Sequence, residues 1–214
     1  MQKIKNNKFF GRERICSSII DTKIKGRTLN IGAGEMRWIE NHLFLNNKNF
    51  FSSDIDEKNL GKDNKSANKV KCDATKMPFK DGYFSQVIIL DVLEHIKDHE
   101  KVVEEIHRVL KKNGKLAICV PNDTLLSYLN PVRYVQHERH YTIENITKLL
   151  KAKGFKIKRI FAGGGIFELT GLYIHFFAKY FLKRKISPFS KIIDKEYLRH
   201  RENGNEIAIL AVKN

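Results

Sequence analysis

The chain reads TLNIGAGEM over residues 28–36, and this stretch decides the fold. An apolar run ends there in the turn Gly32-Ala33-Gly34, which leads directly into a helical pattern. A strand that arrives from the core must reverse sharply at such a turn, and glycine permits both positive φ and the close approach of a ligand to bare backbone. The stretch therefore predicts a ligand-binding turn after the first strand of an α/β fold.

Apolar runs and helical periods alternate along the rest of the chain. Strands are expected over residues 28–31, 50–53, 70–72, 86–90, 115–120, 155–161 and 206–212, and helices over 9–24, 36–45, 98–111, 143–153 and 166–182. Asn113-Gly114 is expected to stop the helix over 98–111, and Gly163-Gly164-Gly165 to form a flexible break. This alternation predicts a doubly wound α/β sheet, in which ligands bind beyond the carboxyl ends of the strands.

Polar positions follow four of the expected strands, at Gly34, Asp54, Asp73 and Asp91. A single aspartate after a strand is usually a turn or cap residue, but four strand ends in register predict a binding site. Asp54 lies about twenty residues past the glycines, a spacing that suits a carboxylate accepting hydrogen bonds from ribose hydroxyls. The spacing Gly-x-Gly-x-x-Gly fails at Arg37, which disfavours a nicotinamide-binding protein.

The net charge of +16 over 214 residues is concentrated outside this region. Residues 1–27 hold eight Lys and Arg against two Asp and Glu, residues 148–201 hold fourteen against three, and residues 28–147 hold seventeen of each. Such concentrated charge favours an anionic partner, namely nucleic acid, phospholipid head groups or a phosphorylated metabolite. A solvated surface rich in lysine is the alternative.

The composition predicts one substantial domain with additions. We expect an N-terminal helical cap over 1–27, a core over 28–162 and 203–214, and a helical insertion over 163–202. No continuous apolar segment is visible near the N-terminus, and the three cysteines form no Cys-x-x-Cys pair, so a cytoplasmic location is expected.

The segment 166–182 is rich in aromatic residues but is too short and too polar for a membrane span. It is either a helix packed over the active site or an interfacial helix whose aromatic face enters a bilayer. In the second case the basic residues 183–185 would meet anionic lipid, giving a peripheral membrane contact through 166–185.

Five motifs occur in a specific order: DATKMPF at 73–79, DGYFS at 81–85, LDVLEHI at 90–96, RVLK at 108–111 before Gly114, and HERHYT at 137–142. With the glycine turn, they resemble the class I S-adenosylmethionine-dependent methyltransferases over about residues 28–155. The resemblance implies a Rossmann-like sheet of seven strands whose last strand is antiparallel. It also implies S-adenosyl-L-methionine as the cofactor.

The resemblance also implies a set of site residues. The cofactor-binding positions are Asn30, Gly32, Ala33 and Gly34 at the methionine moiety, Asp54 and Ile55 at the ribose, Asp73 and Ala74 at the adenine, and Asp91 and Val92 near the transferable methyl group. His95 is the candidate base that would deprotonate a hydroxyl acceptor; the alternative is that it starts a helix and bonds to nearby backbone. His140 is the second candidate base; the alternative is that it only positions the substrate. No metal is expected to be required.

Two motifs that are missing after the fourth strand narrow the chemical class of the methyl acceptor. No Asn/Asp-Pro-Pro-Tyr follows the fourth strand, which argues against amino-purine methylation, and no Pro-Cys follows it, which argues against attack on cytosine carbon. We expect O- or C-methylation of an anionic small molecule, a lipid or a lipid-linked sugar. One alternative is an RNA methyltransferase that binds phosphates through its basic ends. Another is a scaffold without catalysis, suggested by Asn30 where the family usually has an acidic residue and by Met36 where it often has a third glycine.

Overall fold

A computed structural model describes residues 11–34, 38–44, 47–61, 68–130, 133, 139–183, 189–198, 200 and 202–214. The expectations that concern residues 9 and 10, Met36, Arg37, residues 137 and 138, and residues 184 and 185 fall outside these residues.

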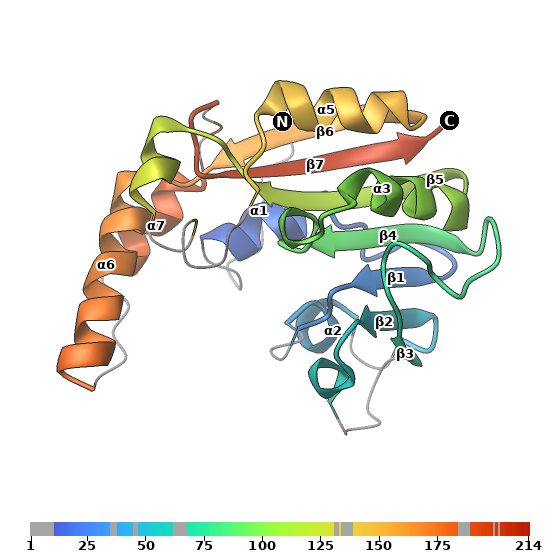
Figure 1. The fold of residues 1–214 in the computed structure, drawn as a ribbon, viewed down its shortest axis with the longest axis horizontal. Helices are drawn as coiled ribbons and strands as arrows, with labels where there is room; N and C mark the ends of the chain where they lie inside the picture. The colour runs from blue at the N-terminus through green and yellow to red at the C-terminus, as the bar shows by residue number, and fades with distance from the viewer. Residues whose placement is uncertain are drawn as a thin grey trace.

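The core of the molecule is one sheet of seven strands in the order β3-β2-β1-β4-β5-β7-β6 (Figure 1). The strands are β1 (Thr28–Ile31), β2 (Phe50–Asp54), β3 (Asn68–Lys71), β4 (Phe84–Leu90), β5 (Leu110–Pro121), β6 (Phe155–Gly163) and β7 (Glu206–Lys213). The first five strands pair in parallel, and β7 runs antiparallel to both of its neighbours. The predicted doubly wound sheet with an antiparallel last strand is confirmed.

Helices cover both faces of the sheet. They are α1 (Arg12–Ile19), α2 (Trp38–Leu43), α3 (His99–Val109), α5 (Ile143–Ala152), α6 (Ile166–Phe181) and α7 (Ser190–Glu196), with the 3₁₀ helices η1 (Glu57–Leu60), η2 (Leu93–His95) and η3 (Leu125–Leu129). Val87 and Ile89 of β4 pack in the cluster that contains α3 and α5, whereas Ile88 packs in the cluster that contains α1 and α2. Alternate side chains of a strand point to opposite faces, so one apolar run supplies both layers.

The helix expected over 98–111 ends earlier than the sequence indicated. It stops at Val109, and the fully buried Leu110 already pairs with Phe84 as the first residue of β5. Asn113 has a φ of 61°, and the register shifts before Lys115 pairs with Gln86. The expected helix stop at Asn113-Gly114 is therefore wrong, because Leu110 gains more from a place in the sheet than from another helical turn.

The glycine run is not a flexible break. Gly163 is the last residue of β6 and pairs with Glu206, and all three glycines of the run are buried. A Cβ added at Gly204 would lie 2.6 Å from the Gly163 nitrogen, so two backbones approach closely there.

Two other helices end earlier than expected. Arg12 is the first residue of α1, after Gly11 with a φ of 54°, and Ile19 is the last. Helix α2 (Trp38–Leu43) ends at Leu43, before the expected end at residue 45, and His42 in its last turn is exposed.

Helix α6 extends away from the sheet (Figure 1). It follows the end of β6, and the chain then continues to α7 and β7. Among the described residues, no helix combines the length and the apolar character that crossing a bilayer requires. The division into cap, core and insertion stays a prediction.

Candidate active site

The turn after β1 has the geometry that its glycines predict. Gly32 and Gly34 have φ values of 68° and 63°, in the region that favours glycine. The Ala33 N–H donates to the Ser53 carbonyl at 3.0 Å, and the Ser53 hydroxyl donates to the Asn30 carbonyl at 3.3 Å. The ends of β1 and β2 are therefore held side by side, with the Asn30 side chain buried beneath the turn.

Gly32 and Gly34 have different surroundings. A Cβ at Gly32 would overlap Val92 Cγ2 and would lie 3.0 Å from Val92 Cγ1, so the loop after β4 packs directly on the turn. A Cβ at Gly34 would meet no atom of the described residues within 4 Å. The turn is closed on the Val92 side and open above Gly34, as expected of a cradle for a ligand.

Asp54 ties the neighbouring strand end to this turn. Its Oδ2 accepts a hydrogen bond from the Gly34 N–H at 3.1 Å, and its Oδ1 accepts from the Asp56 N–H at 3.0 Å and from Asn59 Nδ2 at 3.2 Å. Asp54 is buried, whereas the next predicted residue, Ile55, is 70% exposed. Three donors keep this carboxylate beside the turn.

Asp73 and Ala74 follow the third strand as predicted. The Asp73 carboxylate accepts hydrogen bonds from the N–H and the hydroxyl of Thr75, both at 2.8 Å. The backbone hydrogen bond from Thr75, and then the one from its hydroxyl, lower the pKa of Asp73, so this exposed group is ionised at neutral pH. Ala74 is buried under the same loop.

Asp91 lies at the end of β4, next to Val92, and it meets a cation that the sequence analysis missed. Arg12 Nη1 lies 3.1 Å from Asp91 Oδ2 and 3.6 Å from Glu206 Oε1. Asp91 has a φ of 54°, and its Oδ1 is buried with no hydrogen-bond partner among the described residues. No local motif marks Arg12 or Glu206, because only the sheet order brings α1 and β7 to the end of β4.

The cluster of Asp91, Glu206 and Arg12 has unusual electrostatics. Burial raises the pKa of Asp91, and the Arg12 guanidinium opposes that shift. Burial also raises the pKa of Glu206 well above its ordinary value, followed by repulsion from Asp91. Ligand atoms of Asp91, Cys119 and Glu206 lie within 4.8 Å of one another, but the guanidinium of Arg12 already supplies a cation to the two carboxylates.

A second network connects this cluster to α6 and α7. Glu168 of α6 accepts hydrogen bonds from the Tyr197 hydroxyl and, at 2.9 Å, from Asn205 Nδ2. Tyr197 is fully buried, and the Glu168 charge contributes to the raised pKa of Glu206. The first turn of α6 is therefore part of the surroundings of the site.

The two predicted bases lie on neighbouring segments. His95 ends η2 and is exposed, and the backbone of the preceding Glu94 accepts a hydrogen bond from the Arg139 N–H at 3.2 Å. His140 follows Arg139, and its Nδ1 lies 3.3 Å from the Asn122 carbonyl at the end of β5. Burial lowers the pKa of His140, which keeps the imidazole neutral at pH 7, the form that a base requires.

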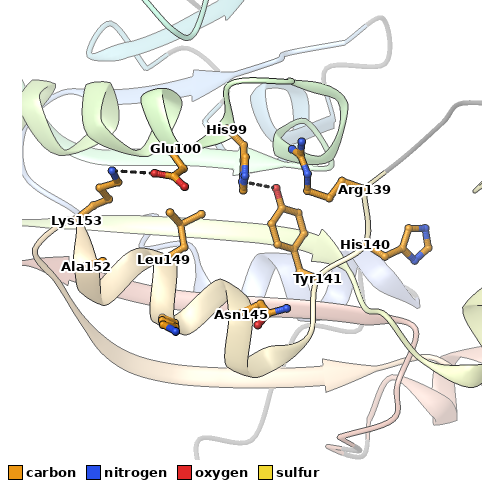
Figure 2. A pocket seen from close by; sticks show the side chains of 10 residues that line it. His99, Glu100, Arg139, His140, Tyr141, Asn145, Leu149, Ala152 and Lys153 are labelled. Atoms are coloured by element: carbon orange, nitrogen blue, oxygen red, sulfur yellow. Dashed lines mark hydrogen bonds and ion pairs between the residues drawn. The ribbon is translucent and has the colours of Figure 1, made fainter.

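His140 also borders a pocket of about 390 Å³ between α3 and α5 (Figure 2). Tyr141 and His99 meet there at 3.0 Å between the hydroxyl and Nδ1, and Lys153 reaches Glu100 at 3.1 Å. His140 itself turns away from the other labelled side chains (Figure 2). None of the strand-end glycines and aspartates lines this pocket, so it is separate from the turn.

Comparison with known proteins identifies the domain to which these strand ends belong. Residues 29–118 match the methyltransferase-domain family, a range that includes the glycine turn, Asp54, Asp73 and Asp91. Over these residues the chain carries a methyltransferase domain, and its sheet has the fold of the class I S-adenosylmethionine-dependent methyltransferases. The open cradle above Gly34 and the unpartnered buried Asp91 Oδ1 both fit a ligand of the kind that this domain binds.

Curated relatives of the methyltransferase domain match over part of their length. An uncharacterized protein of Methanocaldococcus jannaschii is 26% identical over 144 residues, covering 66% of this chain and 59% of that protein. A probable S-adenosylmethionine-dependent methyltransferase of Mycolicibacterium smegmatis is 30% identical over 102 residues, covering 44% of this chain and 38% of that protein. The chain thus spans less than two thirds of the length of each of these two relatives.

Solved structures share the fold of the methyltransferase domain over nearly the whole chain. A methyltransferase of Archaeoglobus fulgidus has a TM-score of 0.64 at 23% identity, covering 94% of this chain and 92% of that one. A methyltransferase of Thermotoga maritima has a TM-score of 0.65 at 16% identity, covering 94% and 87%. At such identities the likeness shows the fold alone.

Proposed function

We propose that the chain transfers a methyl group from S-adenosyl-L-methionine to an oxygen or carbon of a lipid, a lipid-linked sugar or another small molecule. The observation that carries the proposal is the joined strand end, in which Gly34 donates to Asp54 while Gly32 packs on Val92 beside Asp91. This arrangement leaves an open cradle at the carboxyl ends of three adjacent parallel strands, where α/β sheets bind their ligands.

The chain's own residues would hold the cofactor and line the side on which the methyl group is transferred. The backbone of Gly32, Ala33 and Gly34 and the carboxylates of Asp54 and Asp73 would hold the cofactor, which supplies a methyl group on a positively charged sulfur. Asp91 and Val92 would line the methyl-transfer side. Transfer is an in-line displacement, so alignment of the acceptor and exclusion of water supply most of the rate.

The acceptor must lose a proton during O-methylation or C-methylation, and the site offers groups that can take it. The buried Oδ1 of Asp91 accepts a hydrogen bond from the acceptor, because the other oxygen of that carboxylate is engaged by Arg12. His95 and His140 are the proposed proton acceptors, with His140 kept neutral by burial. Glu206, whose pKa is raised well above normal, is a further group able to hold a proton beside Asp91.

Relatives named for quinone biosynthesis favour an acceptor with lipid character. A ubiquinone/menaquinone biosynthesis C-methyltransferase of Desulfotalea psychrophila is 34% identical over 82 residues, which is 38% of this chain and 32% of that protein. A demethylmenaquinone methyltransferase of Streptomyces avermitilis is 43% identical over 47 residues, which is 22% of this chain and 20% of that protein. These names support a lipid acceptor for this chain.

Incubation with methyl-labelled S-adenosyl-L-methionine tests the proposal. A bacterial total lipid extract, a small-metabolite extract and total RNA are the acceptor sources, and Asp54→Asn is the variant that weakens cofactor binding. We expect label in the lipid or metabolite fraction and much less with the variant. Label confined to RNA would overturn the acceptor class, and cofactor binding by calorimetry without label in any fraction would favour the scaffold alternative.

A further inference from the structure

The exposed face of α6 carries aromatic side chains at helical spacing. Tyr173, Phe177, Tyr180 and Phe181 are all exposed, with exposed fractions of 57% for Phe177, 69% for Tyr180 and 75% for Phe181. Their spacing of three or four residues places them on one side of the helix. Burial of Gly171 and Ala178 on the opposite side, and of Leu169 in the first turn, anchors α6 to the domain, and the helix still presents an apolar stripe to the outside.

The neighbouring 3₁₀ helix extends this stripe. Leu125 is 88% exposed and Leu129 is 57% exposed on η3, and the Tyr173 hydroxyl donates a hydrogen bond to the Leu129 carbonyl. We call Leu125, Leu129, Tyr173, Phe177, Tyr180 and Phe181 the aromatic surface. An exposed apolar area of this kind, contributed by two elements, marks a site of interaction with a membrane or a protein.

Basic residues accompany the aromatic surface. Lys179 and Lys183 are exposed beside it, and the sequence continues with Arg184 and Lys185. Tyrosine and phenylalanine together with lysine are the composition of helices that lie in the interface of a bilayer. A second copy of the chain would bring the same positive charges to the contact, whereas an anionic bilayer complements them.

The position of α6 suits a contact that serves the active site. Its first turn carries Glu168, whose charge acts on Glu206 in the cluster with Arg12 and Asp91. From there the helix leads away from the sheet (Figure 1). Sixteen residues make a helix of about 24 Å, shorter than the hydrocarbon core of a bilayer, so α6 would lie in the interface rather than cross it.

We propose that the aromatic surface docks the domain on an anionic lipid bilayer, with Phe177, Tyr180 and Phe181 entering the head-group region and Lys179 and Lys183 contacting lipid phosphates. The role of this contact in delivering a lipid acceptor rests on the proposed function, but the docking itself does not. A bilayer contact at α6 brings the lipid phase to the helix that begins beside Glu206.

Cosedimentation with vesicles of phosphatidylglycerol and phosphatidylcholine in equal parts tests the docking, with pure phosphatidylcholine as the neutral arm. We expect binding to the anionic vesicles and at least tenfold weaker binding to the neutral ones. Lys179→Gln with Lys183→Gln should lower the affinity about 25-fold, or about fivefold for each charge. The matched control is Lys156→Gln with Lys158→Gln. These exposed lysines lie near the start of β6, at the end far from α6, and their replacement should change the affinity for anionic vesicles less than twofold.

A spectroscopic variant reports insertion directly. The chain has one tryptophan, Trp38 on α2, so Trp38→Phe with Phe177→Trp places the only indole on the aromatic surface. We expect its emission to shift to shorter wavelength with anionic vesicles, and Tyr180→Ser with Phe181→Ser to weaken vesicle binding by more than tenfold. An unshifted emission, or lysine variants that bind like the wild type, would overturn the docking.

Calorimetry with S-adenosyl-L-methionine on the same samples separates the two proposals. Retained cofactor binding shows that the variants are folded, and loss of vesicle binding alone then concerns the aromatic surface. Failure of the wild type to bind cofactor while it still binds vesicles would contradict the proposed function and leave the docking in place.

Discussion

Arg12 Nη1 lies 3.1 Å from Asp91 Oδ2, so a cation from the first helix of the structure meets the carboxylate that ends the central strand β4. The same guanidinium nitrogen lies 3.6 Å from Glu206 Oε1 at the start of β7. Two carboxylates with raised pKa values therefore share one cation at the carboxyl edge of the sheet. Removal of any one of the three groups changes the energy of the other two.

The first prediction concerns the coupling of Arg12 and Asp91. Arg12→Gln should lower the free energy of unfolding by about 1–2 kcal/mol, less than for a fully buried pair because the Arg12 side chain is 46% exposed. In the Asp91→Asn background the same change should cost much less, since asparagine tolerates the positive φ and carries no charge. Urea unfolding of the four proteins measures the coupling.

A matched control for this cycle is Lys25→Gln, an exposed lysine that follows α1. It should leave the unfolding midpoint within experimental scatter. Equal costs of Arg12→Gln in both backgrounds would contradict the energetic coupling seen in the geometry.

The second prediction concerns the pH dependence of stability through Glu206. Burial raises the pKa of Glu206, so the folded state holds its proton at pH values where the unfolded chain has lost it. Glu206 therefore costs nothing below its unfolded pKa of about 4.3, and its cost grows as pH rises toward the folded pKa. Glu206→Gln removes this cost and should raise the melting temperature more at pH 8 than at pH 5.

Thermal unfolding of Glu206→Gln at the two pH values, beside the exposed control Glu202→Gln, makes the measurement. The gain of Glu206→Gln over wild type should grow with pH, whereas the control should show no such trend. A gain that is the same at pH 5 and pH 8 would show that the ionisation of Glu206 does not oppose folding.

Local patterns predicted much of the fold correctly because the signals lie close together in the sequence. The first strand was predicted as Thr28–Ile31 and forms over those residues. The helix predicted from residue 143 begins there, and Thr142 caps it by accepting the Asn145 N–H at 3.0 Å. The failure at Asn113-Gly114 has a tertiary cause, since Leu110 leaves the helix to pair with Phe84. A turn signal cannot distinguish a helix stop from an irregularity at the start of a strand.

The site was predictable only in part, because some of its residues are brought together by tertiary packing alone. Gly32, Gly34, Asp54 and Asp91 each follow a strand, and the order of the strands brings these ends to one edge of the sheet. Arg12 and Glu206 belong to segments far from them in sequence, and neither follows a motif. Their meeting at Asp91 depends on how α1 and the antiparallel β7 pack, which no local spacing encodes.

The third prediction concerns Arg108, which fixes the loop after Ala74. Its guanidinium binds both oxygens of Glu105 at 2.7 and 2.8 Å, and it donates to the carbonyls of Met77 and Phe79 at 3.0 and 2.7 Å. Arg108→Ala should lower the free energy of unfolding by about 2–3 kcal/mol, because several charge-assisted hydrogen bonds are lost at once. Arg108→Lys should recover only part, since an ammonium cannot reproduce the planar fork.

Urea unfolding measures both Arg108 variants, with Lys101→Ala on the exposed side of α3 as the control. The control should cost less than 0.5 kcal/mol, roughly the usual effect of a surface substitution. Full recovery by lysine would show that charge alone, rather than the bidentate geometry, holds this loop.

The last prediction separates the two glycines of the turn. Gly32→Ala places a methyl group against Val92 at a φ of 68°, so strain and overlap add, whereas Gly34→Ala at 63° meets strain alone. The strain costs roughly 1–2 kcal/mol at either position. Gly32→Ala should therefore be the less stable protein, and Val92→Ala should recover part of its loss by removing the atoms that overlap.

Gly34→Ala should instead weaken the binding of S-adenosyl-L-methionine about tenfold or more in calorimetry, because its methyl group projects into the open side of the cradle. Equal losses of stability in both alanine variants, with cofactor affinity unchanged in Gly34→Ala, would place the cofactor away from this turn.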